Sequence, residues 1–107
     1  MQLLEHLPQA RGVRDPEVLE TFRRDESHLT GPLPLAVVLP HGPDALQELV
    51  RIAQGEGLGL VPRGAGTGKA GGCLPTARSV VVDFSEYPGQ LQLSREDLCL
   101  SAPASAW

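Results

Sequence analysis

The chain has 107 residues, of which 41% are apolar and 21% charged, and its formal net charge is −4. This length predicts one domain at most. The acidic balance, with 13 Asp and Glu against 9 Lys and Arg, and the lack of a basic cluster argue against a nucleic-acid partner. The 12 glycines and 10 prolines predict loops that need unusual backbone angles.

The sequence shows no pattern of a disulfide framework, a metal site or a membrane span. Cys73 and Cys99 lie far apart, with no histidine or further thiol at ligand spacing near either. The N-terminal residues lack a basic start followed by an apolar stretch, and no apolar run approaches the length of a transmembrane helix. We therefore expect a cytoplasmic protein, for which peripheral attachment to a membrane through a partner would leave no trace in the sequence.

The first predicted element is a short helix within an N-terminal lead-in (residues 1–34). Asp15 is placed as N-cap, Pro16 at the first helical position and Glu17 in the first turn, where its charge suits the positive end of the helix dipole. Apolar side chains then continue the pattern to about Arg24.

The next segment predicts a strand, a helix and a second strand. The apolar run over 35–39, bounded by prolines, is typical of a strand buried on both faces. A helix is expected over 43–54, after Gly42 as N-cap and before Gly55 or Gly57 as its end. A second buried strand over 58–62 completes a unit suited to a parallel crossover.

The remaining elements are a third buried strand over 79–83 and two short strands over 91–93 and 98–100. Residues 102–107 close with neither helix nor strand. We interpret residues 35–107 as the first lobe of a truncated domain.

The chemistry is concentrated in the glycine-rich loop at residues 63–72, directly after a predicted strand. Glycines at this density let successive N–H groups point into one concavity without an intervening Cβ. Such a loop is suited to bind an anion such as a phosphate. The alternative is that the loop is only a flexible turn.

Two familiar phosphate-binding motifs do not fit this loop. A P-loop would need glycine where Arg63 stands and Ser or Thr where Ala70 stands. A dinucleotide fingerprint is formally present over 66–71, but Pro75 opposes the helix that should follow, and Asp83 comes too early for the acidic partner.

A third interpretation comes from several segments taken together, which are Arg24–Ser27, Ala36–Pro40, the helix over 43–54, Val61–Gly68 with Gly71 and Gly72, and Val81–Ser85. They resemble FAD-linked oxidases of the PCMH-type (vanillyl-alcohol oxidase) superfamily, in particular its glycolate oxidase subunit and D-lactate dehydrogenase branch. The agreement extends over roughly residues 15–103. It implies an α+β fold: the N-terminal lobe of a PCMH-type FAD-binding domain, a small mostly parallel sheet with flanking helices, its second lobe missing.

The resemblance also implies the cofactor site. In that family the loop after the second strand wraps the FAD diphosphate with backbone amides. The residues from 63 to 68 would form this cradle, two later glycines would let the chain pass close to the flavin, and residues at the ends of the first and third strands would close the site. The implied contacts are Pro40, Arg63, Gly64, Ala65, Gly66, Thr67, Gly68, Gly71, Gly72, Asp83 and Ser85.

Some positions depart from the family pattern or allow a simpler role. Lys69 stands where an apolar or small residue is common and is expected in solvent, and Cys73 is expected to pack. Asp83 could equally cap the turn that follows its strand. Because the loop contains no histidine, the implied FAD is non-covalent.

The expected function is FAD binding as the N-terminal part of an oxidoreductase that acts on a 2-hydroxy acid such as glycolate or D-lactate, inactive as this fragment. No catalytic residue is nominated. Expected partners are FAD and the missing remainder of the enzyme or partner subunits. The alternative is a non-catalytic module that keeps the fold and binds an anion or a partner protein.

Overall fold

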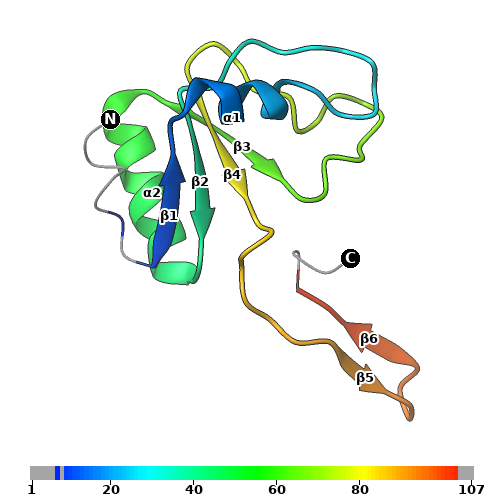
Figure 1. Ribbon diagram of the computed structural model, residues 1–107. Helices are drawn as coiled ribbons and strands as arrows, with labels where there is room; N and C mark the ends of the chain where they lie inside the picture. The colour runs from blue at the N-terminus through cyan, green and yellow to red at the C-terminus, as the bar shows by residue number, and fades with distance from the viewer. Residues whose placement is uncertain (1–6, 8, 104–107) are drawn as a thin grey trace.

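The computed structural model describes residue 7 and residues 9–103. Figure 1 shows a four-stranded sheet with helices packed against it and a two-stranded hairpin that extends away from the sheet. In chain order the elements are β1 (Ala10–Val13), α1 (Pro16–Glu20), a 3-10 turn (Thr21–Arg23), β2 (Ala36–Pro40), α2 (Pro43–Glu56), β3 (Gly59–Arg63), β4 (Ser79–Asp83), β5 (Gln92–Ser94) and β6 (Cys99–Ser101).

The four strands of the sheet lie in the order β1-β2-β4-β3. Strands β2 and β3 both run parallel to β4, whereas β1 runs antiparallel to β2. Helix α2 therefore connects two parallel strands that are separated by β4. This arrangement confirms the predicted small, mostly parallel sheet with flanking helices.

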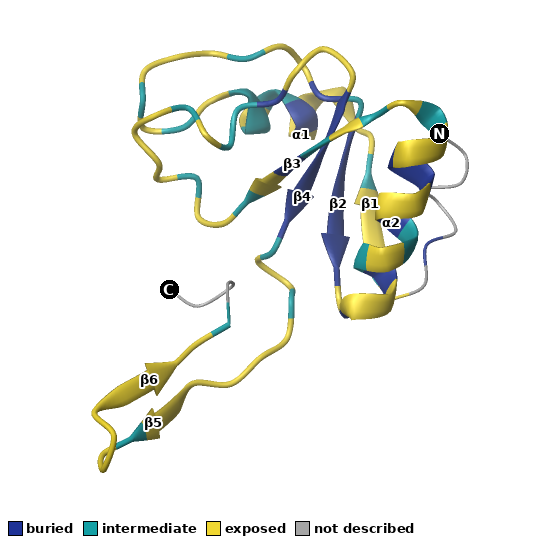
Figure 2. Cartoon of the chain, turned by 180° about the vertical axis from the view of Figure 1, so that it is seen from behind, coloured by how far each residue is buried: buried dark blue, intermediate teal, exposed yellow. Residues whose placement is uncertain are grey.

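Two of the three strands predicted as fully buried are so in the structure. Every residue of β2 and β4 is buried, as the dark strands of Figure 2 show. The prediction was wrong for β3, in which Val61 is the buried residue and Gly59 and Pro62 are exposed. The reason is topological: β4 takes the central place, which leaves β3 at the edge, where a proline without an N–H is tolerated.

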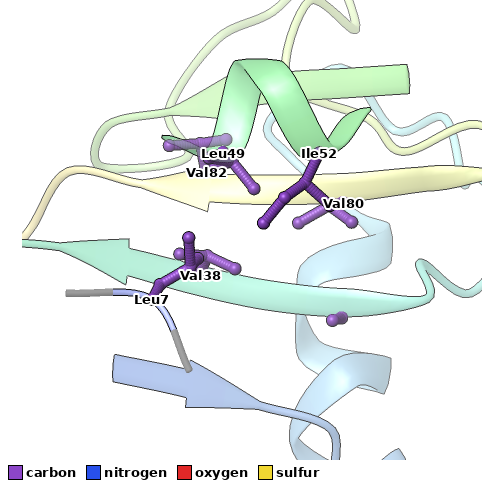
Figure 3. Close-up of a cluster of buried hydrophobic side chains, with 7 residues drawn as sticks. Leu7, Val38, Leu49, Ile52, Val80 and Val82 are labelled. Carbon is purple, nitrogen blue, oxygen red and sulfur yellow. The ribbon is translucent and has the colours of Figure 1, made fainter. Parts of the chain in front are cut away.

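Alternate side chains of the central strands supply two apolar layers, one on each face of the sheet. On one face, Val38, Val80 and Val82 pack with Leu49 and Ile52 of α2 (Figure 3). On the other face, Val37, Leu39 and Val81 pack with Leu19 of α1. Helices therefore cover both faces, which explains why the central strands are continuously apolar.

The helix ends follow the predicted local signals. The Asp15 carboxylate accepts a hydrogen bond from the Glu17 N–H at 3.0 Å, as an N-cap should. Helix α1 is shorter than expected, because the chain tightens into the 3-10 turn after Glu20. Helix α2 ends at Gly57, whose φ of 68° is the left-handed conformation that glycine adopts readily.

Strand β1 was not predicted. Its sequence, Ala-Arg-Gly-Val, has a weak strand pattern, and its pairing with β2 is what forms it. The lead-in thus contributes a strand to the sheet, and its boundary at residue 34 stays a prediction.

The hairpin formed by β5 and β6 lies close to the two predicted short strands. Leu93 pairs directly with Leu100, so both side chains point to the same face, and they are 68% and 63% exposed. The hairpin therefore presents an unpartnered apolar face in this structure. Within the described part of the chain, no helix is long and apolar enough to cross a membrane.

Candidate functional site

The predicted site residues gather at one edge of the sheet. Parallel strands end on the same side, and the register pairs Arg63, the last residue of β3, with Asp83, the last residue of β4. Pro40 ends the neighbouring strand β2 in the same direction. Ligands of α/β sheets bind at this carboxyl edge, from which the glycine-rich loop also emerges.

The first half of the loop leaves its backbone donors free. Among the hydrogen bonds of the described residues, none uses a backbone N–H from Gly64 through Gly68 as donor. A Cβ placed on Gly64 would meet no atom of the described chain within 4 Å. Ala65, Thr67 and Gly68 are exposed. Free, exposed amides next to small residues fit the oxygens of a diphosphate.

Two glycines of the loop have backbone angles that other residues rarely adopt. Gly66 has a φ of 74° and Gly71 a φ of 80°. The position of a Cβ on Gly71 lies 3.5 Å from Leu29 and 3.3 Å from Leu74, whereas Gly72 has open space. The loop therefore needs glycine at 66 and 71 for its conformation.

The side chain of Arg63 turns back under the loop. Its guanidinium donates to the carbonyl oxygen of Arg24 at 3.0 Å and to that of Phe22 at 3.3 Å, and it lies 5.2 Å from the centre of the Phe22 ring. A Cβ on Gly66 would come within 2.4 Å of this guanidinium. Arg63 thus ties the start of the loop to the segment after α1. Lys69 is exposed, as expected.

Asp83 is buried and caps the turn after β4. Its carboxylate accepts a hydrogen bond from the Ser85 N–H at 2.8 Å. This is the simpler role considered for Asp83, and it fixes the backbone of Ser85 at the carboxyl edge of the sheet.

The second half of the loop contacts the segment that follows the 3-10 turn. The Glu26 N–H donates to the Gly68 carbonyl oxygen at 3.0 Å, and the Cys73 thiol lies 3.8 Å from the Asp25 carboxylate. Hydrogen bonds from the Ser27 hydroxyl and Ser27 N–H lower the pKa of Asp25, with smaller contributions from the Cys73 thiol and the Gly71 N–H. The Asp25 carboxylate is therefore held ionised beside the loop.

A second ionic cluster lies where the chain leaves the sheet. The Glu86 carboxylate accepts from the Arg11 guanidinium at 3.1 Å and contacts His41 Nε2 at 2.7 Å. These hydrogen bonds, the stronger from Arg11, lower the pKa of Glu86 to about 2. The cluster joins β1, the end of β2 and the segment after β4.

Cys73 and Cys99 are both free thiols. Over residue 7 and residues 9–103, no group of three or more His, Cys, Asp or Glu side chains is placed to hold a metal ion.

A family model described as FAD binding domain matches residues 34–106. The chain belongs to this FAD-binding family. The match confirms the resemblance to the PCMH-type superfamily, and FAD is the cofactor of the domain. The free amides between Gly64 and Gly68 fit the diphosphate of that cofactor.

Two curated proteins are similar in sequence. D-2-hydroxyglutarate dehydrogenase from Xanthomonas citri pv. viticola is 29% identical over 104 residues, which are 97% of this chain and 22% of the relative. Glycolate oxidase subunit GlcD from Bacillus subtilis is 32% identical over 66 residues, 62% of this chain and 14% of the relative. The chain thus spans less than a quarter of the length of either relative.

Solved structures share the fold. The structure of Physcomitrella patens BBE-like 1 aligns with a TM-score of 0.66 at 25% identity and covers 89% of this chain and 21% of that one. Aclacinomycin oxidoreductase aligns with a TM-score of 0.61 at 20% identity and covers 81% of this chain and 18% of that one. The architecture is that of the N-terminal lobe of the FAD-binding domain in the PCMH family.

Sequence reasoning assigned no role to the contacts of Asp25 and Glu26 with the loop. A local signal existed, since Asp followed two residues later by Ser is typical of a turn in which the carboxylate accepts the later N–H. The signal could not say which distant segment would pack against that carboxylate.

Proposed function

We propose that this chain binds the diphosphate of FAD within an oxidoreductase that acts on a 2-hydroxy acid, such as glycolate or D-lactate. The names of the two curated relatives support the substrate class. Because the chain spans 22% and 14% of their lengths, the activity belongs to a longer assembly, formed with the remainder of the enzyme or with partner subunits.

The observation that carries this proposal is the set of free backbone N–H groups at the carboxyl edge of the sheet. The amides from Gly64 to Gly68 donate to the diphosphate oxygens, and the Thr67 hydroxyl adds a donor. Pro40 and the Asp83–Ser85 turn line the same edge, and Gly71 and Gly72 would let the chain pass close to the flavin.

FAD, when bound, supplies an acceptor for the hydride of the carbon that carries the substrate hydroxyl group. The described residues orient the cofactor through its diphosphate, and we assign no acid or base among them. The loop has no histidine, so the proposed binding is non-covalent.

A titration with two ligands tests the cradle. We expect FAD fluorescence to be quenched on addition of the 107-residue chain, and ADP, which shares the diphosphate, to shift the amide NMR signals of residues 64–68. Lys69→Ala should retain most of the affinity for both ligands, because the Lys69 side chain is exposed.

Riboflavin is the matched control, since it has the flavin ring and no phosphate. The assignment is contradicted if ADP leaves these amides unchanged, or if riboflavin shifts them as FAD does. A chain that binds neither FAD nor ADP would favour the alternative, a module that keeps the fold for a partner protein.

A further inference from the structure

The segment Asp25–Ser27, here named the acidic strap, lies against the glycine-rich loop although the two are far apart in the sequence. Figures 1 and 2 both show the chain after α1 running beside the chain after β3. The hydrogen bond from the Glu26 N–H to the Gly68 carbonyl oxygen, at 3.0 Å, joins them directly. The strap is therefore part of the wall of the proposed cofactor site.

The strap contacts only one half of the loop. The Asp25 carboxylate accepts from the Cys73 thiol at 3.8 Å, and its Oδ2 lies 3.8 Å from the position of a Cβ on Gly68. The N–H groups from Gly64 to Thr67 make no such bond among the described residues. The loop is thus divided into a held half (68–73), in which Gly68 is held through its carbonyl oxygen and keeps a free N–H, and a free half (64–67).

The strap is itself fixed by hydrogen bonds, so it can hold the second half of the loop in one position. The other oxygen of Asp25 accepts the Ser27 N–H at 2.8 Å, which closes a local turn. Directly before the strap in the sequence, the carbonyl oxygens of Phe22 and Arg24 accept hydrogen bonds from the Arg63 guanidinium. Both ends of the loop are therefore fastened to the same stretch of chain.

Charge alone would make Asp25 unfavourable at this place. A carboxylate beside a loop that binds an anion repels that anion, and its removal should strengthen binding if no other effect acts. A hydrogen-bonding role predicts the opposite sign, because loss of the acceptor frees the held half of the loop. The sign of the effect therefore separates the two roles.

We infer that Asp25 is a positioning residue, which holds residues 68–73 so that the amides of residues 64–67 stay free and aligned for the diphosphate. The inference rests on the proposed function, since it concerns the same loop. It adds that a negatively charged residue next to the cradle strengthens the binding of a negatively charged ligand, because the hydrogen bonds that it accepts outweigh its repulsion.

The test compares Asp25→Asn with Glu26→Gln in the full chain, using ADP and FAD as probes. Both variants remove one negative charge from the strap, but the Glu26 side chain is exposed and makes no hydrogen bond with the loop among the described residues. We expect Asp25→Asn to weaken both probes about tenfold, the effect of losing one hydrogen bond to a charged group. Glu26→Gln should leave binding equal or slightly tighter.

Two further measurements distinguish positioning from general destabilisation. Amide hydrogen exchange in the ligand-free chain should speed up at Leu74, whose N–H donates to the Gly71 carbonyl oxygen at 3.2 Å, in Asp25→Asn and not in Glu26→Gln, while the exchange of core strand amides stays unchanged. Cys73→Ser, which keeps a donor for Asp25, should bind as the wild type does, and Cys73→Ala should be weaker.

These measurements either support or overturn the positioning role of Asp25. Tighter or unchanged binding in Asp25→Asn, or unchanged exchange at Leu74, overturns the positioning role. If the wild type binds neither probe, the proposed function fails, and exchange at Leu74 still reports whether Asp25 holds the loop.

Discussion

Replacement of Gly66 by alanine tests whether the loop depends on both a left-handed glycine and the Arg63 clamp. At a φ of 74°, a residue with a Cβ is strained by about 1–2 kcal/mol. The added Cβ would also lie 2.4 Å from Nη2 of Arg63, so the guanidinium must move away from the carbonyl oxygens of Phe22 and Arg24. Because these contacts are partly exposed, we expect a total loss of about 1–3 kcal/mol in the free energy of unfolding.

The assay is thermal unfolding followed by circular dichroism, together with the FAD titration. A loss of this size should lower the melting temperature by at least about 5 °C in a domain of this length. Gly64→Ala is the control, because its Cβ enters open space, and it should melt as the wild type does.

A double mutant separates the two causes. In an Arg63→Met background, Gly66→Ala should keep only the backbone part of its destabilising effect, because the guanidinium that its Cβ would displace is absent. The two substitutions should therefore not be additive. Equal melting temperatures for Gly66→Ala and Gly64→Ala would refute this account of the loop.

Three further substitutions test the ionic cluster, the hairpin and the core. The pKa of Glu86 is lowered to about 2 by Arg11 first, so the stability from this pair is present above the usual pKa of 4.5 and is lost as pH falls through about 2. In the wild type, the urea concentration at the unfolding midpoint should therefore fall as the pH is lowered from 4.5 to about 2, and Glu86→Gln should make this fall smaller. An equal fall in the wild type and in Glu86→Gln would contradict the pairing. We expect the exposed apolar face of the hairpin to cause self-association of the chain, so Leu93→Ser with Leu100→Ser should reduce the apparent mass in light scattering without lowering the melting temperature. An apparent mass that these substitutions leave unchanged would contradict this role of the hairpin. Val81→Ala, at a fully buried position, should destabilise the fold by about 2–3 kcal/mol in urea unfolding, and a loss below about 1 kcal/mol would show that the layer repacks.

Local signals in the sequence predicted the elements whose ends are defined by their own residues. Asp15 and Pro16 began α1, Gly57 ended α2, and the valines of β4 identified a buried strand. Such signals involve only a few neighbouring residues, so they can be recognised in the sequence without knowledge of the fold. They failed for β1, whose four residues become a strand through pairing with β2.

The sequence by itself determined the family and the apolar central strands, and it predicted an anion-binding loop, since each depends on residue types in a short stretch. Only the tertiary structure decided that β3 lies at the sheet edge, because strand order depends on the later insertion of β4. It likewise decided that the Arg63 guanidinium lies beside Gly66 and donates to the carbonyl oxygens of Phe22 and Arg24, and that Asp25 contacts Cys73. These contacts join segments about forty residues apart, and their pairing is set by how the whole chain packs.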